Sequence, residues 1–203
     1  MKLLEIENII DSLATSHSEA FVPKENVRQA AVAAILRPVK NGTEALFILR
    51  SKKDGDPWSG QMAFPGGHYE TQDRSLRETA ERETLEEIGL DLVNDAKFVG
   101  KIADVQANPR GRDLTMNVSP FVFVLENQNA KIQLNYEVAD VLWGSLNDMF
   151  VGTTATRHPF HVMGRTEEFP GYSVGNQVVW GLTLRMLDHF FTRLDPAWQP
   201  GYK

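Results

Sequence analysis

The sequence contains no cysteine and no long apolar run. The missing cysteine excludes thiol catalysis, disulfide bonds and zinc sites with cysteine ligands. No apolar stretch approaches the roughly 20 residues that a membrane-spanning helix needs, so we expect no membrane partner. Residues 1–5 include an acidic side chain and lack the apolar segment of a signal peptide. We therefore expect a cytoplasmic protein.

An excess of basic residues is also missing, because the 203-residue chain has a formal net charge of −6. This charge argues against binding to the phosphate backbone of a nucleic acid. Phosphorylated small molecules stay open as ligands, because a bound cation can reverse the local charge. The length suits one domain with a full hydrophobic core, so we expect a single domain over residues 1–203.

The hydrophobic pattern predicts a mixed sheet with helices on both faces, an α+β fold of the α/β/α sandwich type. An amphipathic helix is expected over about residues 1–16, where Leu3, Ile6 and Ile10 share one stripe. A last helix is expected over residues 177–194, followed by a short polar tail. The expected strands cover residues 30–36, 45–50, 61–64, 97–105, 114–125, 132–134 and 138–143, and the stretch 152–171 is expected to be irregular or a hairpin.

The most informative stretch, residues 66–90, is a Gly-Gly turn followed by a short helix rich in carboxylates. Ser75 and Glu78 have the spacing of a capping box, which marks the start of a helix. Gly89 suits the position just past the helix end, where the backbone often turns left-handed. These signals predict a helix between residues 75 and 89.

Three carboxylates of this helix, Glu83, Glu86 and Glu87, have the spacing i, i+3 and i+4 and share one face. Their like charges repel one another, and oxygen ligands gathered this closely suit a hard divalent cation such as Mg²⁺ or Mn²⁺. Arg82 stands beside them and can orient a carboxylate by bidentate hydrogen bonds. The competing interpretation is a solvated acidic helix face. The combination of Gly turn, cap, Arg, Glu trio and closing Gly favours a metal site.

This stretch resembles the Nudix box, Gly-x5-Glu-x7-Arg-Glu-U-x-Glu-Glu-x-Gly-U, in which U is aliphatic. Gly67 opens the match, and the half that carries the metal ligands follows intact from Arg82. The sequence departs from the pattern in three places: Asp73 replaces the first Glu, eight residues instead of seven separate it from Arg82, and Thr84 replaces an aliphatic residue. The strand plan extends the resemblance over residues 28–194 and implies the Nudix fold.

The segment before the box narrows the resemblance. Residues 60–67 read Gly-x-x-x-Phe-Pro-Gly-Gly, which is similar to the corresponding segment of coenzyme A pyrophosphatases. In that branch we also expect the extra residue inside the box. The branch has an Arg four residues before Gly60, where this sequence has Asp56. The coenzyme A signature is therefore half present, and coenzyme A, ADP-ribose, NDP-sugars and dinucleotides all stay open as substrates.

The resemblance implies a pyrophosphohydrolase that splits a nucleoside diphosphate linked to another group into two phosphorylated products. It assigns the metal ligands to Glu83, Glu86, Glu87 and the carbonyl of Gly67, with Mg²⁺ or Mn²⁺ as the cofactor. Arg82 would then orient Glu86 or Glu83.

The general base is open between Glu83 and acids outside the box. Glu137, between two expected strands, is one candidate, and Glu167 or Glu168 is another. For Glu137 the competing interpretation is a turn acid before a strand.

Five further residues are candidates for contacts with a nucleotide-linked small molecule. Arg50 and Lys52, at the end of an expected strand, suit phosphate oxygens. Arg110 lies in a loop with Gly and Pro and is a candidate for closing over the substrate. Trp58 and Tyr172 are candidates for stacking on a base.

Two other functions stay open. One is a non-catalytic Nudix-fold module that senses a nucleotide, and the other is mRNA decapping, which the acidic charge disfavours. The N-terminal helix lies outside the family's core plan. A homodimer contact and a cover for the sheet are both open roles for it.

Overall fold

The computed structural model describes residues 4–14, 27–56, 58–107, 115–162 and 164–202. None of the helices in this part of the chain has the length and apolar content to cross a bilayer. The elements in chain order are α1 (Ile6–Leu13), β1 (Arg28–Val39), β2 (Gly42–Arg50), β3 (Met62–Ala63), β4 (Gly66–His68), α2 (Leu76–Ile88), α3 (Leu92–Asp95), β5 (Ala96–Lys101), β6 (Val105–Ala107), β7 (Met116–Leu125), β8 (Val138–Ser145), α4 (Leu146–Phe150), β9 (Ala155–Val162), β10 (Arg165–Val174), β11 (Gln177–Trp180) and α5 (Gly181–Leu194).

The larger sheet is mixed. Its strand order is β3-β2-β1-β7-β5, with β4 also paired to β1, β6 to β7 and β8 to β2. β1 and β7 are parallel, from Arg28 opposite Met116 to Leu36 opposite Val124, whereas β2 and β4 pair with β1 in the antiparallel sense. A parallel pair at the centre of a sheet is covered on both faces, which is why β7 is an almost continuous run of buried side chains.

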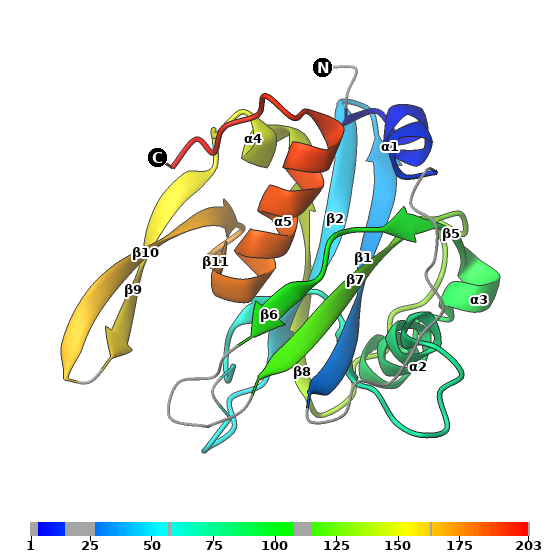
Figure 1. The fold of residues 1–203 in the computed structure, drawn as a ribbon, viewed down its shortest axis with the longest axis horizontal. Helices are drawn as coiled ribbons and strands as arrows, with labels where there is room; N and C mark the ends of the chain where they lie inside the picture. Colours follow the sequence, from blue (N-terminus) through cyan, green and yellow to red (C-terminus); the bar gives the residue numbers. More distant parts are fainter. Residues whose placement is uncertain (1–3, 15–26, 57, 108–114, 163, 203) are drawn as a thin grey trace.

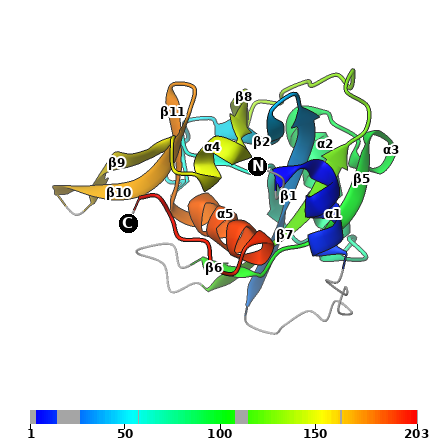
Figure 2. The ribbon, with the colours of Figure 1, turned by 90° about the horizontal axis from the view of Figure 1, so that it is seen from above.

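Helices cover both faces of this sheet (Figures 1 and 2). Side chains of β1 alternate between two cores because successive residues of a strand point to opposite faces. Ala34 and Leu36 belong to the core that includes α1 and α5, whereas Ala33 and Ile35 belong to the core that includes α2. The structure therefore confirms the predicted α/β/α sandwich.

The N-terminal helix is shorter than the expected span of about 1–16, because α1 covers Ile6–Leu13. Residues 1–3 and 15–16 lie outside the described residues. α1 buries Ile9 and Leu13 in the core that it shares with α5, so this helix covers the sheet. A homodimer contact stays a prediction.

The smaller sheet, in the order β11-β10-β9, corrects the expected last helix. Its β9–β10 hairpin projects from the body of the molecule (Figure 1). Residues 177–180 form β11, and α5 begins only at Gly181, whose φ of +62° is a left-handed value that favours glycine. Val178, Val179 and Trp180 favour a strand, and the Trp180 ring packs on the rings of His158, Phe160 and Phe169.

Residues 132–134, expected as a strand, form none. They run past the end of α2, where the amide of Gln133 donates to the Ile88 carbonyl at 2.8 Å and that of Asn135 to the Glu87 carbonyl at 2.9 Å. These helix-end carbonyls would otherwise lack partners. The loop consequently passes close to α2 just before Glu137.

Candidate active site

Two glycines of β4 allow close packing, Gly66 against β1 and Gly67 against α2. Gly66 has φ +147°, and a Cβ there would overlap with the Ala31 carbonyl of β1. A Cβ on Gly67 would overlap with the Glu83 carboxylate. The missing side chains therefore let the Glu83 side chain lie directly against the backbone of β4.

The predicted ends of α2 are confirmed. Ser75 is the N-cap, and its hydroxyl accepts from the Glu78 amide at 3.1 Å. The Glu78 carboxylate accepts from the amide of Arg74 instead of Ser75, so the capping box is displaced by one residue on its return side. Gly89 ends the helix with φ +67° and donates its amide to the Leu85 carbonyl.

Arg82 is held mainly by Asp73. Its Nε lies 2.9 Å from Asp73 Oδ1 and its Nη2 lies 3.0 Å from Asp73 Oδ2, which makes the contact bidentate. The remaining donors reach Glu83 Oε1 at 3.0 Å and the His68 carbonyl at 3.0 Å, whereas Glu86 Oε1 is 3.4 Å away. Arg82 therefore orients Glu83 more closely than Glu86, and Asp73 fixes Arg82.

Glu87 is a poorly compensated carboxylate, and the pKa of Glu83 is raised in spite of its contact with Arg82. Glu87 is 2% exposed, and within the described residues a single hydrogen bond reaches its carboxylate, from the Gly66 amide at 2.8 Å. Arg50 Nη1 is 3.8 Å from Glu87 Oε1. Burial raises the pKa of Glu87 to about 7, against the smaller opposing effects of Gly66 and Arg50. Burial also raises the pKa of Glu83, although Arg82 opposes the shift.

Glu137 faces the same space from a different element. It precedes β8, and its charge is one of the causes that raise the pKa of Glu87, after the larger effect of burial. Glu86 points elsewhere, because its side chain is 57% exposed and does not line the cavity. Glu167 and Glu168 are exposed on β10, in the projecting hairpin, and do not line it either.

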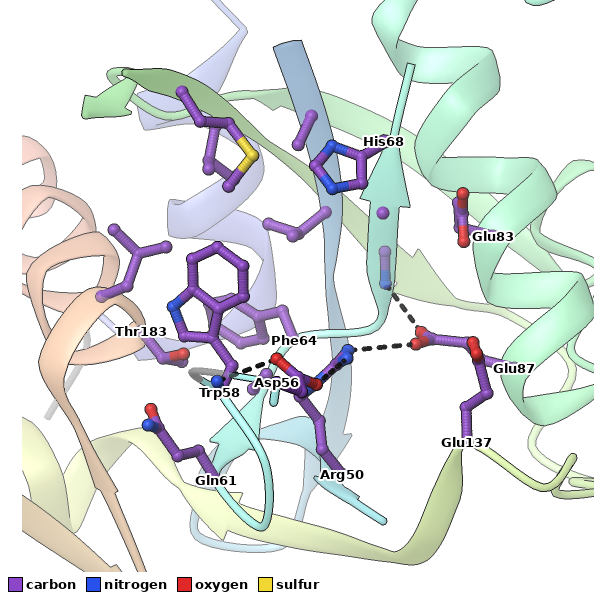
Figure 3. Close-up of a pocket in the computed structure, with 18 of the residues that line it drawn as sticks. Arg50, Asp56, Trp58, Gln61, Phe64, His68, Glu83, Glu87, Glu137 and Thr183 are labelled. Carbon is purple, nitrogen blue, oxygen red and sulfur yellow. Dashed lines mark hydrogen bonds and ion pairs between the residues drawn. The ribbon is translucent and has the colours of Figure 1, made fainter. Parts of the chain in front are cut away.

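A cavity of about 550 Å³ opens between β4, α2 and the loop that follows β2. Figure 3 shows the carboxylates of Glu83, Glu87 and Glu137 on one side and the rings of Trp58 and Phe64 on the other. Arg50 and Asp56 lie between the two sides. Further apolar lining comes from Ala30, Val32, Met62, Met116, Val118 and Leu182. The cavity therefore joins an acidic wall to an apolar wall.

The five predicted substrate contacts are placed differently. Arg50 and Trp58 line the cavity, whereas Lys52 is exposed and its neighbour Lys53 lines it instead. Arg110 lies outside the described residues.

Tyr172 is not at the cavity, which corrects the expectation that it stacks on a base. It is fully buried in the core, where its ring contacts those of Phe191 and Tyr202. The residue is the eighth position of β10, and its side chain faces inward from the small sheet because alternate residues of a strand share a face.

Two residues at the cavity were missed by the sequence analysis as site residues. His68 lines the cavity next to Gly67, and its position directly after the Gly-Gly pair was the available signal. Asp56 lines it as well and pairs with Arg50. The sequence analysis noted Asp56 only as a departure from a family pattern. No sequence spacing rule predicts its contact with Arg50, six residues earlier, because a loop brings the two together.

The donor set suits a hard divalent cation. The groups facing the cavity from α2 and from the residue before β8 are carboxylate oxygens, and burial raises the pKa of two of them, Glu83 and Glu87. A cation would supply the missing positive charge. In the described part of the chain, no three His, Asp or Glu side chains are positioned so that they could already hold one metal ion. The fit therefore rests on ligand chemistry and charge.

Comparisons with known proteins agree on one family. Residues 27–162 match the family model described as the NUDIX domain. A protein of Schizosaccharomyces pombe is 32% identical over 163 residues, which cover 71% of this chain and 50% of that relative. The chain thus spans about half the length of that relative. The Nudix hydrolase NudL of Pectobacterium atrosepticum is 29% identical, with 79% of this chain and 81% of NudL covered.

One solved structure extends the comparison to the fold. The Ap4A hydrolase of C. elegans, in a binary complex, has a TM-score of 0.51 and 22% sequence identity to this chain. The match covers 60% of this chain and 82% of that protein. At this identity the likeness concerns the fold.

Proposed function

The chain belongs to the Nudix family, and on that premise we propose that it is a divalent-metal-dependent pyrophosphohydrolase. Its substrates would be nucleoside diphosphates linked to another group. The observation that carries the proposal is a pair of carboxylates with raised pKa values, the buried Glu87 and the partly buried Glu83, facing a cavity with an apolar opposite wall. A purely structural carboxylate would be completed by protein donors, whereas Glu87, among the described residues, accepts one hydrogen bond and has its nearest cation, Arg50, 3.8 Å away.

In this proposal Glu83, Glu87, Glu86 and the carbonyl of Gly67 hold Mg²⁺ or Mn²⁺. When bound, the cation neutralises diphosphate oxygens and makes water a better nucleophile. Glu86 is the outlying member of the set, because it is half-exposed and outside the cavity in this structure. Arg82 holds Glu83 in place through its hydrogen bond of 3.0 Å.

The reaction requires one carboxylate to accept a proton from the attacking water. The water oxygen bonds to one phosphorus, the bridging P–O bond breaks, and two phosphorylated products leave. We assign the role of proton acceptor to Glu137, because its carboxylate lines the cavity near Glu87 and comes from outside the box (Figure 3). Glu83 is the other candidate base.

The remaining lining residues suit the rest of the substrate. Arg50 lies between the acidic and apolar walls and suits a phosphate oxygen. Its Nε is buried with no hydrogen-bond partner in the described residues, so the guanidinium retains an unused donor. The Trp58 ring on the apolar wall suits stacking on a base or packing on an apolar group. Coenzyme A, ADP-ribose, NDP-sugars and dinucleotides such as Ap4A share this combination of diphosphate and ring.

A substrate panel tests the proposal. The protein is incubated with Mg²⁺ or Mn²⁺ and coenzyme A, dephospho-coenzyme A, ADP-ribose, NADH, Ap4A, NDP-sugars and a capped RNA, and products are separated by anion-exchange chromatography. We expect cleavage of at least one small molecule into two phosphorylated products, and its abolition by EDTA and by Glu83→Gln. Calorimetric binding of a panel member with no cleavage under any condition would support the alternative, a nucleotide-sensing module.

A further inference from the structure

Arg50 lies between two carboxylates at unequal distances. Its Nη2 is 2.9 Å from Asp56 Oδ2, a direct ion pair, whereas its Nη1 is 3.8 Å from Glu87 Oε1, which is too far for a hydrogen bond. Figure 3 shows the three side chains in a row, with Arg50 in the middle. In this structure Arg50 is therefore hydrogen-bonded to Asp56 and makes only a longer ion pair with Glu87.

Asp56 is itself held in one orientation. Its second oxygen, Oδ1, accepts the backbone amide of Trp58 at 2.9 Å. Burial alone would raise the pKa of Asp56, but the hydrogen bonds from Trp58 and Arg50 outweigh it, so the pKa is lowered. Asp56 is thus an ionised, oriented anion at neutral pH, and it fixes the side of Arg50 that faces it.

Glu87 would be the natural partner of Arg50 if Asp56 were absent. Glu87 Oε2 already accepts the Gly66 amide, and a shift of Arg50 Nη1 by roughly 1 Å would bring Oε1 to ordinary hydrogen-bond distance. Both oxygens of Glu87 would then be occupied by protein donors. An incoming cation would have to displace a buried ion pair before it could bind.

We propose that Asp56 is a positioning residue that holds Arg50 away from Glu87 and so keeps the Glu87 carboxylate accessible to a divalent cation. The inference rests on the proposed metal-dependent function. It adds a residue outside the box to the control of the metal site. It also assigns two properties to Arg50. Arg50 leaves the Glu87 carboxylate open to a cation, and it stays close enough to the acidic wall to bind a phosphate oxygen.

Binding of Mn²⁺ alone, with no substrate present, tests the inference. Titration calorimetry, together with paramagnetic resonance of the unbound ion, gives the dissociation constant for the wild type, Asp56→Asn, Arg50→Gln and the double variant. Asn at position 56 keeps an oxygen for the Trp58 amide and removes the charge that holds Arg50. Thermal melting checks that each variant is folded.

We expect Asp56→Asn to weaken Mn²⁺ binding by about 3- to 10-fold when Arg50 is present, the range of a partly buried ion pair. In the Arg50→Gln background the same substitution should change the dissociation constant by less than about 2-fold, because the competing cation is gone. Asp54→Asn is the matched control. It removes the same charge from the same loop and the same cavity lining, and should change binding by less than about 2-fold.

The double-mutant cycle separates positioning from other effects. An equal effect of Asp56→Asn in both Arg50 backgrounds would show a through-space effect of its charge or a loop defect, and would overturn the inference. So would an effect no larger than that of Asp54→Asn. If the wild type hydrolyses a panel substrate and binds Mn²⁺ while Asp56→Asn is unchanged, the inference alone fails. If the wild type neither binds Mn²⁺ nor hydrolyses any substrate, the proposed function fails and the inference with it.

Discussion

Asp73, which contacts α2, and Glu87, which belongs to it, are both buried carboxylates, yet their surroundings are opposite. Asp73 is 5% exposed and accepts four hydrogen bonds, two from Arg82, one from the Thr79 hydroxyl and one from the Glu70 amide. Burial would raise the pKa of Asp73, but these donors outweigh burial and lower it. Glu87 is 2% exposed, has the Gly66 amide as its hydrogen-bond donor, and has its pKa raised to about 7.

The difference lies in where the compensating charge comes from. The protein itself completes the surroundings of Asp73, so this carboxylate stabilises the fold and anchors Arg82. The surroundings of Glu87 are incomplete and face a cavity, so its charge costs stability until a cation arrives. Equal burial can therefore mark a framework residue or a functional residue, and the number of donors distinguishes them.

Replacing Glu87 tests the functional side of the comparison and should have the largest effect. Glu87→Gln keeps an oxygen for the Gly66 amide but removes a charged cation ligand. We expect kcat on the panel substrate to fall by about 10²- to 10³-fold, the size of a lost electrostatic contact at a reacting centre. The free energy of unfolding in metal-free buffer should stay level or rise by about 1 kcal/mol, because an uncompensated charge is removed.

Glu81→Gln is the matched control for this variant. Glu81 is on the same helix and is half-buried, but it pairs with Arg77 and does not line the cavity. Its replacement should leave kcat unchanged within about 2-fold, as for other substitutions away from the site. A clear loss of stability in Glu87→Gln together with retained activity would reverse the assignment of the two carboxylates.

Replacing Asp73 tests the framework side. Asp73→Asn should lower the free energy of unfolding by about 2–3 kcal/mol, because the half-buried Arg82 loses its charged partner. Activity should fall less than in Glu87→Gln. The fall would arise because Arg82, without Asp73, becomes more mobile and then positions Glu83 less well. Chemical denaturation and initial rates measure both effects. An Asp73→Asn protein as stable as the wild type would contradict the structural role of Asp73.

Local sequence signals predicted the parts of the site that depend on short spacing. Ser75 and Gly89 were located because a cap and a left-handed C-terminus are determined by residues within one helical turn. Helical spacing also predicted a shared face for Glu83, Glu86 and Glu87. Glu83 and Glu87 line the cavity, but Glu86 does not and is 57% exposed. The sheet and its helical layers were predicted from hydrophobic periodicity.

The sequence could not predict contacts that loops create. Arg82 was expected to orient box carboxylates, but its bidentate partner is Asp73, which an irregular turn brings back to the helix. Arg50 and Asp56 meet across a loop in which no periodicity applies. Residues 177–180 were expected to begin the last helix and instead form a strand, because the left-handed backbone of Gly181 delays the helix start.

The contributions of Glu87 and Asp73 to stability should change in opposite directions with pH. The pKa of Glu87 is raised to about 7 in the folded protein, so its protonation stabilises the fold below about pH 4, and this contribution is lost as the pH rises to about 7. The pKa of Asp73 is lowered, so its contribution is present above about pH 4 and is lost as the pH falls through the folded pKa.

Denaturation of the wild type and Glu87→Gln in EDTA between pH 4 and pH 8 measures this difference. The variant should gain about 1–3 kcal/mol relative to the wild type across that range. Other carboxylates titrate in both proteins and largely cancel in the difference. A constant difference between the two proteins across the range would show that Glu87 has an ordinary pKa.

Replacing Tyr172 tests whether a buried polar group without a hydrogen-bond partner must belong to a functional site. This replacement should have the smallest effect. Its hydroxyl is buried with no hydrogen-bond partner in the described residues, and burial raises its pKa, yet the side chain lies in the core away from the cavity. Tyr172→Phe removes only that hydroxyl.

We expect the free energy of unfolding of Tyr172→Phe to change by less than about 1 kcal/mol, because no hydrogen bond is lost. The value of kcat/KM on the panel substrate should stay within about 2-fold of the wild type, as for other substitutions outside the site. A larger fall in kcat/KM, at unchanged stability, would restore Tyr172 to the substrate contacts and show that missing donors mark function even without a cavity.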